Sequence, residues 1–152
     1  MIKQICDSRE KLKISRSILE NLTEWFEIEE SREKYIGDSA DQIFIADREA
    51  DGYTGFICLG ETGKDTAEIA VMGVLKEYQR QGIGRRLIEK AKDIAVSAGY
   101  SFIQVKTVRM GIYDEYDRTN LFYQSCGFKE FEVFPDLWGK ENPCQIYVMA
   151  LQ

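Results

Sequence analysis

The sequence predicts a mixed α/β fold, in which a mostly antiparallel sheet contains one central parallel pair of strands. An apolar run of strand length at 68–74 is followed by a glycine-containing turn, a helix and a second strand at 102–108. A strand–helix–strand crossover of this kind makes its two strands parallel. The remaining runs of strand length follow one another across short turns, as antiparallel neighbours do.

The first half of the chain predicts a strand, two helices and a hairpin. A helix is expected from about Ser8 to Leu22, with Ser8 as its N-cap. A second, highly charged helix follows at 28–35, and a loop beginning at Gly37 closes it. The strands expected in this half are 2–6, 42–48 and 53–59, and a further turn is expected at 60–65.

The second half predicts one long amphipathic helix, a helix around residue 123 and two final strands. The long helix follows the turn after 68–74, and Gly99 ends it. Its apolar positions recur at helical spacing: Ile83, Leu87, Ala91, Ile94 and Ala98. The final strands are expected at 128–134 and 145–151. The connector between them is a candidate for shaping an acceptor site or a subunit contact, which leaves a homodimer open.

Composition limits the classes of function that this chain can have. Its 152 residues suit a single domain spanning 1–152. A net charge of −6 makes nucleic acid an improbable partner. The chain has no apolar run of 18 residues and its first residues lack the apolar core of a signal peptide, so we expect no membrane partner and a cytoplasmic location.

The cysteine and histidine content limits the kinds of catalysis and metal binding that the chain can carry out. The cysteines are Cys6, Cys58, Cys126 and Cys144. Their wide spacing fits neither a zinc site nor a disulfide framework, so we expect no metal and four reduced, buried thiols. The absence of histidine excludes Ser-His-Asp and Cys-His catalysis. Acid–base chemistry must therefore come from carboxylates, tyrosine, lysine or cysteine.

The stretch from Gln79 to Arg85 has the character of an anion site. Residues 79–84 contain no Ser, Thr, Asp or Asn to cap the helix that begins there. Gly82 and Gly84 allow a ligand to approach the backbone closely, and the helix dipole favours negative charge at this end. A phosphate group satisfies both conditions.

Three phosphate-binding patterns compete for this stretch, and spacing separates them. A P-loop is absent, and a dinucleotide fingerprint would need a small residue where Leu87 stands. The pattern Gln/Arg-x-x-Gly-x-Gly/Ala matches residues 79–84 at every required position. On this motif the chain resembles the GCN5-related N-acetyltransferases (GNAT), and the run from Asn120 to Phe128 is similar to a second signature of that family. The resemblance covers roughly residues 40–150.

The resemblance implies a sheet of six or seven strands flanked by about four helices. It also implies acetyl-CoA as the cofactor, a coenzyme-binding core at about 66–130 and acceptor-side helices at about 8–37. The family's loop binds the coenzyme pyrophosphate, and the strand before it contacts the thioester and the pantetheine arm. The matching residues here are Met72, Gly73 and Val74 in the strand, and Gln79, Arg80, Gln81, Gly82, Ile83, Gly84 and Arg85 in the loop.

Two residues are candidates for catalysis by the same resemblance. Glu68 lies 14 residues before Gly82, the offset of the family's glutamate base, although it could also be a solvent-facing carboxylate. Tyr123 matches a tyrosine that stands near the coenzyme sulfur. Where many members carry an asparagine for the pantetheine arm, this chain has Tyr116. We expect the nearby Asn120 to serve as a coenzyme contact.

The function expected is therefore acetyl-CoA-dependent N-acetylation of a primary amine on a small molecule or peptide, by direct attack on the thioester. A non-catalytic acyl-CoA-binding sensor or interaction module is the main alternative, and a protein that binds another nucleotide is a second. The acceptor is expected to be cationic if three tyrosines and three carboxylates share one cleft. These residues are Tyr113, Tyr116, Tyr123, Asp114, Glu115 and Asp117.

Overall fold

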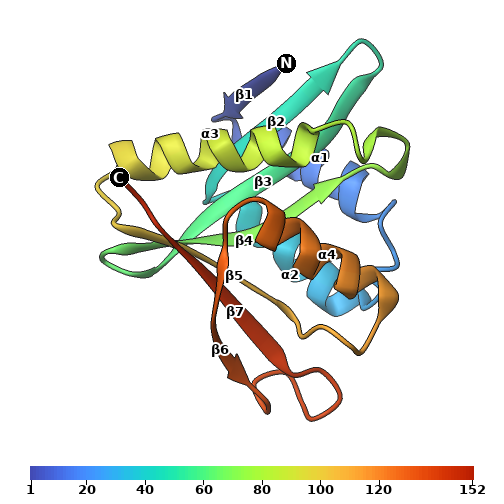
Figure 1. Ribbon diagram of the computed structural model, residues 1–152. Helices are drawn as coiled ribbons and strands as arrows, with labels where there is room; N and C mark the ends of the chain where they lie inside the picture. The colour runs from blue at the N-terminus through green and yellow to red at the C-terminus, as the bar shows by residue number, and fades with distance from the viewer. The chain divides into compact units, whose positions relative to one another are not determined.

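The computed structural model describes residues 1–152 and divides into two compact units. The first comprises Met1–Gly60 with Ile69–Ile94, and the second Glu61–Glu68 with Ala95–Gln152. In chain order the elements are β1 (Ile2–Ile5), α1 (Ser8–Leu19), α2 (Glu29–Ser39), β2 (Ile43–Glu49), β3 (Gly52–Gly63), β4 (Thr66–Val74), the 3-10 helix η1 (Lys76–Tyr78), α3 (Ile83–Ser97), β5 (Phe102–Val108), α4 (Asp114–Ser125), β6 (Lys129–Phe134) and β7 (Cys144–Ala150) (Figure 1).

The strands form one seven-stranded sheet in the order β1-β2-β3-β4-β5-β7-β6. Neighbours β4 and β5 are joined through helix α3, the crossover that makes them the parallel pair. Pairs β1–β2, β2–β3, β5–β7 and β6–β7 are antiparallel. The predicted mixed sheet with a parallel pair and four α-helices is therefore confirmed.

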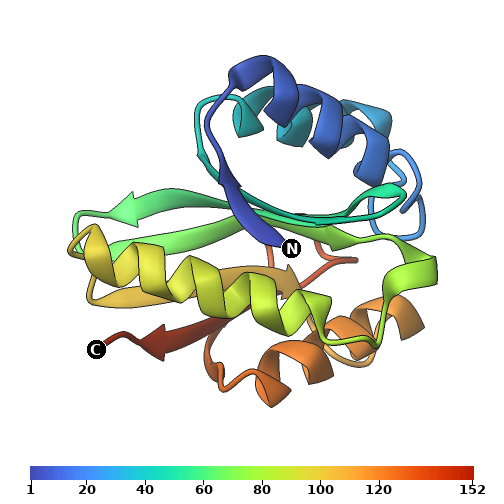
Figure 2. The same ribbon diagram turned by 90° about the horizontal axis from the view of Figure 1, so that it is seen from above.

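In the first unit, helices cover both faces of the strands. Helices α1 and α2 lie on one face and α3 on the other (Figure 2). The apolar stripe of α1 meets the inward-facing side chains of β2, β3 and β4, as expected for an amphipathic helix on a sheet. Its core cluster contains Ile5, Ile14, Ile18, Leu19, Leu22, Ile36, Phe44, Ala46, Phe56, Cys58 and Val71.

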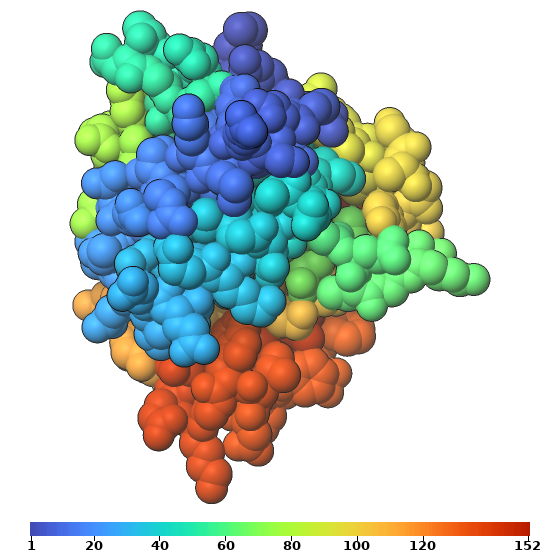
Figure 3. Space-filling view, turned by 180° about the vertical axis from the view of Figure 1, so that it is seen from behind, coloured from blue at the N-terminus to red at the C-terminus, as the bar shows by residue number.

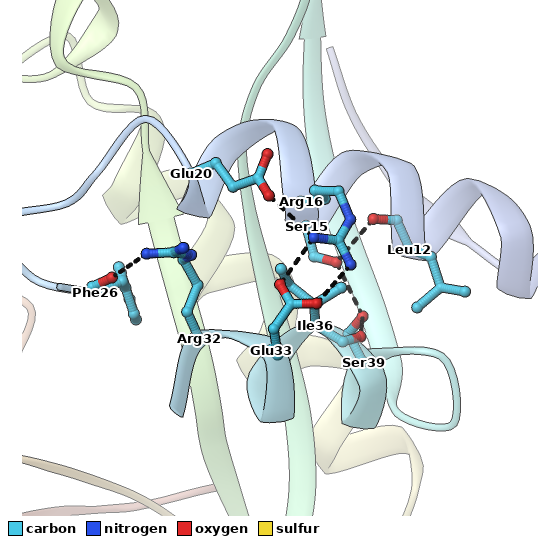
Figure 4. Close-up of polar contacts among 9 residues, drawn as sticks. All are labelled: Leu12, Ser15, Arg16, Glu20, Phe26, Arg32, Glu33, Ile36 and Ser39. Carbon is cyan, nitrogen blue, oxygen red and sulfur yellow. Dashed lines mark hydrogen bonds and ion pairs between the residues drawn. The ribbon is translucent and has the colours of Figure 1, made fainter. Parts of the chain in front are cut away.

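Polar contacts fix helix α2 against α1, and both helices present their outer sides at the surface (Figure 3). The Ser15 and Ser39 hydroxyls, both fully buried, lie 3.2 Å apart (Figure 4). Arg16 donates to both carboxylate oxygens of Glu33, at 2.8 and 2.9 Å. This ion pair is nearly half exposed and stabilises the fold little. The buried serine pair therefore does more to set the position of α2 along α1.

In the second unit, α4 packs on one face of the β5–β7–β6 antiparallel strands. Val105 pairs with Tyr147, and both side chains are buried on the α4 side. Residues two apart share a face of a strand, so Gln104, Lys106 and Val108 occupy the opposite face of β5. That alternation determines which polar side chains of β5 can meet Glu68.

Helix α1 differs from the prediction at both ends. Its N-cap is Asp7, whose side chain accepts from the Arg9 N–H at 3.2 Å, whereas Ser8 donates to the Ala40 carbonyl. The helix ends at Leu19, before Leu22. The side-chain amide of Asn21 donates a hydrogen bond to the Ser17 carbonyl at 2.6 Å, in place of a backbone N–H of a further helical turn. The prediction of Ser8 as cap was wrong by one residue.

Two predicted loops are regular structure instead. Helix α2 continues through Gly37 to Ser39, because the buried contacts of Ile36 and Ser39 outweigh the low helix propensity of glycine. Strand β3 continues to Gly63 because its hairpin partner β4 begins at Thr66, which leaves only a short turn. Three of the four cysteines are buried as expected, but Cys6 is exposed.

The edge strand β6 and the connector after it expose several large apolar side chains. These are Phe131, Phe134, Leu137 and Trp138. Such a patch would suit a contact with another molecule. The subunit contact expected from the connector stays a prediction. No helix of the structure is long and apolar enough to cross a membrane.

Gly73 of β4 provides a test of how α1 packs on the sheet. A Cβ atom added at Gly73 would lie 2.8 Å from the Leu22 side chain and 3.3 Å from that of Ile18. We predict that Gly73→Ala lowers the free energy of unfolding by about 1–3 kcal/mol through overpacking, as measured by urea denaturation. Gly63→Ala is the control, because a Cβ there meets nothing within 4 Å. Equal stability of the two variants would contradict this packing.

Candidate active site

The loop that follows β4 is held in place by the first residue of the glycine motif. The side-chain amide of Gln79 donates to the carbonyl of Val74 at 2.8 Å, and so ties the loop to the end of the strand. The N–H of Leu75 donates to the Thr54 carbonyl at 2.8 Å, which fixes the same strand end on β3. Gln79 therefore acts as a support for the loop through its side chain.

Two residues of this loop have a left-handed backbone. Arg80 has φ of 63° and Gly82 has φ of 83°. For a residue with a side chain, such as Arg80, this conformation costs about 1–2 kcal/mol and often occurs at functional sites. Alternation of left-handed and right-handed residues turns successive N–H groups toward one side and creates a concave anion site.

Helix α3 begins directly after this turn, and the residue before it, Gly82, has no side chain. The first helical hydrogen bond runs from the Arg86 N–H to the Gly82 carbonyl at 3.1 Å, so Gly82 occupies the N-cap position. In general, the first backbone N–H groups of an α-helix have no acceptor within the helix, and here those of Ile83 and Gly84 lie in this first turn. Together with the positive end of the helix dipole, they form a site suited to phosphate.

The strand residues expected to contact the coenzyme show a structural reason for the glycine among them. Side chains alternate along β4, so Met72 and Val74 are partly exposed while Gly73 is buried. The space beside the Gly73 α-carbon is filled by Leu22, which follows α1, and by Ile18 of α1. Packing alone thus explains the glycine. Backbone contacts of Met72, Gly73 and Val74 with a pantetheine arm stay a prediction.

In the second unit, Glu68 belongs to a small polar cluster. Its Oε2 accepts from the Lys106 ammonium at 2.5 Å and from the Gln104 amide at 3.2 Å. The Glu68 and Lys106 side chains are 20% and 28% exposed, so the pair is partly shielded from water. Because both donors use Oε2, Oε1 remains the oxygen that can accept a proton from a further partner.

The Cys144 thiol interacts electrostatically with both members of this ion pair. Burial raises the pKa of its thiol to about 11; Lys106 opposes this shift, and Glu68 adds to it. The thiol is completely buried and stays protonated at neutral pH. Cys144 is therefore unsuited to act as a thiolate nucleophile.

Asn120 has a structural role within the protein, and its expected contact with the coenzyme stays a prediction. Its side chain is completely buried, and its amide nitrogen donates to the carbonyls of Val108 at 2.8 Å and Tyr116 at 2.7 Å. Its amide oxygen accepts from the Tyr147 hydroxyl at 2.6 Å. Both N–H groups are thus used within the protein, and the side chain joins β5, α4 and β7.

Tyr123 lies in the core of the second unit, with 6% of its surface exposed. Its ring centroid lies 5.7 Å from that of Phe128 and 6.2 Å from that of Tyr147. Tyr113 and Tyr116 form a separate edge contact at 6.0 Å. Tyr116 and Tyr123 are about two helical turns, or about 10 Å, apart along α4. Whether the three tyrosines line one cleft stays a prediction.

The acidic residues near Tyr113 also have local roles. Asp114, Glu115 and Asp117 lie in the first turn of α4, where negative charge is favoured by the helix dipole. The Asp117 carboxylate accepts from the Gly111 N–H at 2.7 Å and thereby orders the turn before the helix. The predicted cation site formed by these carboxylates and the tyrosines stays a prediction.

Sequence reasoning missed Lys106, Gln104 and Tyr147 as partners of the candidate residues. Lys106 and Gln104 stand two apart in β5, and this alternation was a usable signal that both share one face. No local signal linked that face to Glu68, because the contact joins residues 36 and 38 positions apart. The partnership of Tyr147 with Asn120 likewise depends on the register of β7.

The chain belongs to the GNAT acetyltransferase family. Residues 39–130, more than half of the chain, match the model of the acetyltransferase (GNAT) domain. The match contains both the loop with Gly82 and the helix with Tyr123. The fold and the uncapped start of α3 agree with this assignment.

Two curated relatives are similar over half of this chain. An uncharacterized N-acetyltransferase of Chlorobaculum tepidum is 33% identical over 81 residues, 51% of this chain and 46% of that protein. The N-alpha-acetyltransferase RimI of Mycobacterium tuberculosis is 35% identical over 78 residues, 51% of this chain and 44% of that protein. The chain thus matches about half the length of these relatives.

Solved structures show the same fold at lower identity. A GNAT-family protein from Desulfovibrio desulfuricans superposes with a TM-score of 0.84 at 18% identity, over 100% of this chain and 99% of that chain. An aminoglycoside 6'-N-acetyltransferase in complex with coenzyme A gives 0.76 at 20% identity, over 99% and 96% of the two chains. These similarities establish the architecture.

The Tyr147 hydroxyl predicts a stability difference at alkaline pH. Burial raises the pKa of this phenol above its ordinary value of 10, so its contribution is present below pH 10 and is lost as pH rises through the folded-state pKa. We predict that the wild type loses more unfolding free energy between pH 9.5 and 11 than Tyr147→Phe does. Urea denaturation measures this, with the exposed Tyr113→Phe as control. Parallel profiles for wild type and Tyr147→Phe would contradict the role.

Proposed function

We propose that this protein is an acetyl-CoA-dependent N-acetyltransferase that acts on a primary amine. The observation that carries the proposal is the uncapped start of α3, with the left-handed Arg80 and Gly82 before it. This backbone suits the pyrophosphate of coenzyme A. Membership of the GNAT family and the motif at residues 79–84 support the same assignment.

The loop and the strand before it would bind different parts of the coenzyme. The N–H groups from Gln81 to Arg85 would bind the pyrophosphate, while Gln79 holds the loop to β4. Backbone groups of Met72, Gly73 and Val74 would pair with the amides of the pantetheine arm and with the thioester oxygen. The coenzyme would supply an acetyl group that is activated as a thioester.

Deprotonation of the acceptor is the first chemical demand on the protein. An alkyl amine with a pKa of about 10.4 is almost fully protonated at pH 7 and cannot attack a carbonyl carbon in that form. Glu68 would take one proton from the amine, directly or through water. Its Oε1 would accept this proton, because Lys106 and Gln104 both donate to Oε2.

Proton return to sulfur is the second demand. As the new N–C bond forms, the C–S bond breaks and the sulfur leaves as a thiolate. Tyr123 would donate its hydroxyl proton to that sulfur, and the proton released by the attacking nitrogen restores the phenol. With a thiol pKa near 8.5 the sulfur is already a fair leaving group, so Tyr123 assists more modestly than Glu68.

The acceptor is proposed to be an amine on a small molecule or a peptide. The names of the similar proteins include an N-alpha-acetyltransferase and an aminoglycoside acetyltransferase, so both acceptor classes occur among them. Tyr113 and Asp114 are exposed and would favour a cationic acceptor. The alternative, a non-catalytic acyl-CoA sensor, keeps the loop but needs neither Glu68 nor Tyr123.

Gly82 tests the binding part of the proposal. Gly82→Asp places a negative charge at the helix start, and we predict more than a tenfold rise in the dissociation constant of acetyl-CoA, about 1.4 kcal/mol, by calorimetry. Any side chain at this φ is strained. Gly82→Asn is the matched control, because it has the same shape without the charge. Equal affinities for Asp and Asn would show that charge at this position is irrelevant, and unchanged binding by Gly82→Asp would refute the site.

Glu68 and Tyr123 test the catalytic part. Glu68→Gln keeps the shape of the side chain and removes its basicity, so turnover should fall about a hundredfold, in the range of general base catalysis. Tyr123→Phe should lower turnover by a smaller factor and leave the affinity for acetyl-CoA unchanged. The rate at which the coenzyme A thiol is released measures the turnover of both variants. If Glu68→Gln matches the wild-type rate at every pH up to 9.5, the base is another group.

A further inference from the structure

The ion pair of Glu68 contains a second charged residue to which neither the motifs nor the proposed function gives a role. Lys106 lies on β5, and its ammonium contacts Glu68 Oε2 at 2.5 Å. Gln104, two residues earlier on the same strand face, donates to the same oxygen at 3.2 Å. Two side chains of β5 therefore donate to the same carboxylate oxygen. Their positions are neighbours on one face of the strand, about 7 Å apart along it.

We propose that Lys106 is a positioning residue for acetyl transfer, which with Gln104 holds Oε2 of Glu68 so that Oε1 accepts the proton. The inference rests on the proposed function, because it assigns the base role to Glu68. Lys106 need not contact either substrate. It acts by restricting the carboxylate to one orientation and by keeping a compensating positive charge beside it.

The partial burial of the pair makes this restraint meaningful. An exposed ion pair is weak and mobile, whereas these side chains are only 20% and 28% exposed. The buried Cys144 thiol, which interacts electrostatically with both members of the pair, stays neutral. Lys106 is thus the cation that balances the negative charge of Glu68. Because the ion pair has no net charge, it would receive the acceptor amine without trapping it as a bound ammonium ion.

The chain offers a closely matched control for Lys106. Lys92 on α3 is 26% exposed and forms an ion pair with Glu89 at 3.4 Å. Lys106→Met and Lys92→Met therefore remove the same charge from equally exposed lysines. Lys106→Arg keeps a cation that can still reach the carboxylate, and Glu68→Gln provides the reference for loss of the base.

The experiment measures thiol release from acetyl-CoA with spermidine and with a lysine-containing peptide as acceptor probes, and with water alone. We expect Lys106→Met to lower kcat about tenfold, within the range of acid–base effects, with the KM for acetyl-CoA unchanged within about twofold. Lys106→Arg should recover most of the rate, and Lys92→Met should match the wild type. The double variant Lys106→Met with Glu68→Gln should be no slower than Glu68→Gln alone.

Three results would overturn the inference, and they differ from failure of the function itself. A slow Glu68→Gln with a fully active Lys106→Met would leave the base in place and remove the role of Lys106. Multiplicative losses in the double variant would show that Lys106 acts independently of Glu68. No rescue by Lys106→Arg would mean that positive charge is not what matters. A wild type that binds acetyl-CoA but releases no thiol with any probe would refute the enzyme and the inference together.

Discussion

The start of helix α3 without a capping side chain is the constraint on which the candidate site depends. A helix in water normally satisfies its first N–H groups with a side chain, and Gly82 offers none. The left-handed Arg80 in the preceding turn adds to the cost. Gln79 holds this turn to the end of β4 through the Val74 carbonyl. The protein thus maintains an unfavourable backbone that an anionic ligand would stabilise.

The polar clusters around Asn120 and around Glu68, both in the second unit, differ in how far their hydrogen-bonding groups are paired within the protein. Buried polar groups need partners, and Asn120 satisfies this need completely within the protein. Its amide is therefore structural. Glu68 has two partners on one oxygen and keeps the other oxygen for chemistry. The candidate base is thus a residue whose hydrogen bonding is only partly used internally.

The sequence predicted what depends on neighbours along the chain. The crossover from β4 to β5, the periodic face of α3 and the loop after β4 all follow from local patterns, and the structure contains them. The errors concern contacts between distant residues. Ser39 extends α2 because its hydroxyl contacts that of Ser15. The hydrogen bond between Asn120 and Tyr147 also escaped prediction, because the two residues are 27 positions apart. Helical spacing alone cannot reveal such pairings.

The central claim is that this backbone binds the pyrophosphate of coenzyme A in preference to other phosphates. The most direct measurement is a thermal-shift comparison of acetyl-CoA, ATP and NAD at equal concentrations. A ligand that binds only the native state stabilises it by RT ln(1 + [L]/Kd), so at equal concentrations the tighter ligand gives the larger rise in melting temperature. The account predicts a clear rise with acetyl-CoA and a much smaller one with ATP or NAD. Equal shifts with all three, or a larger shift with ATP, would contradict it.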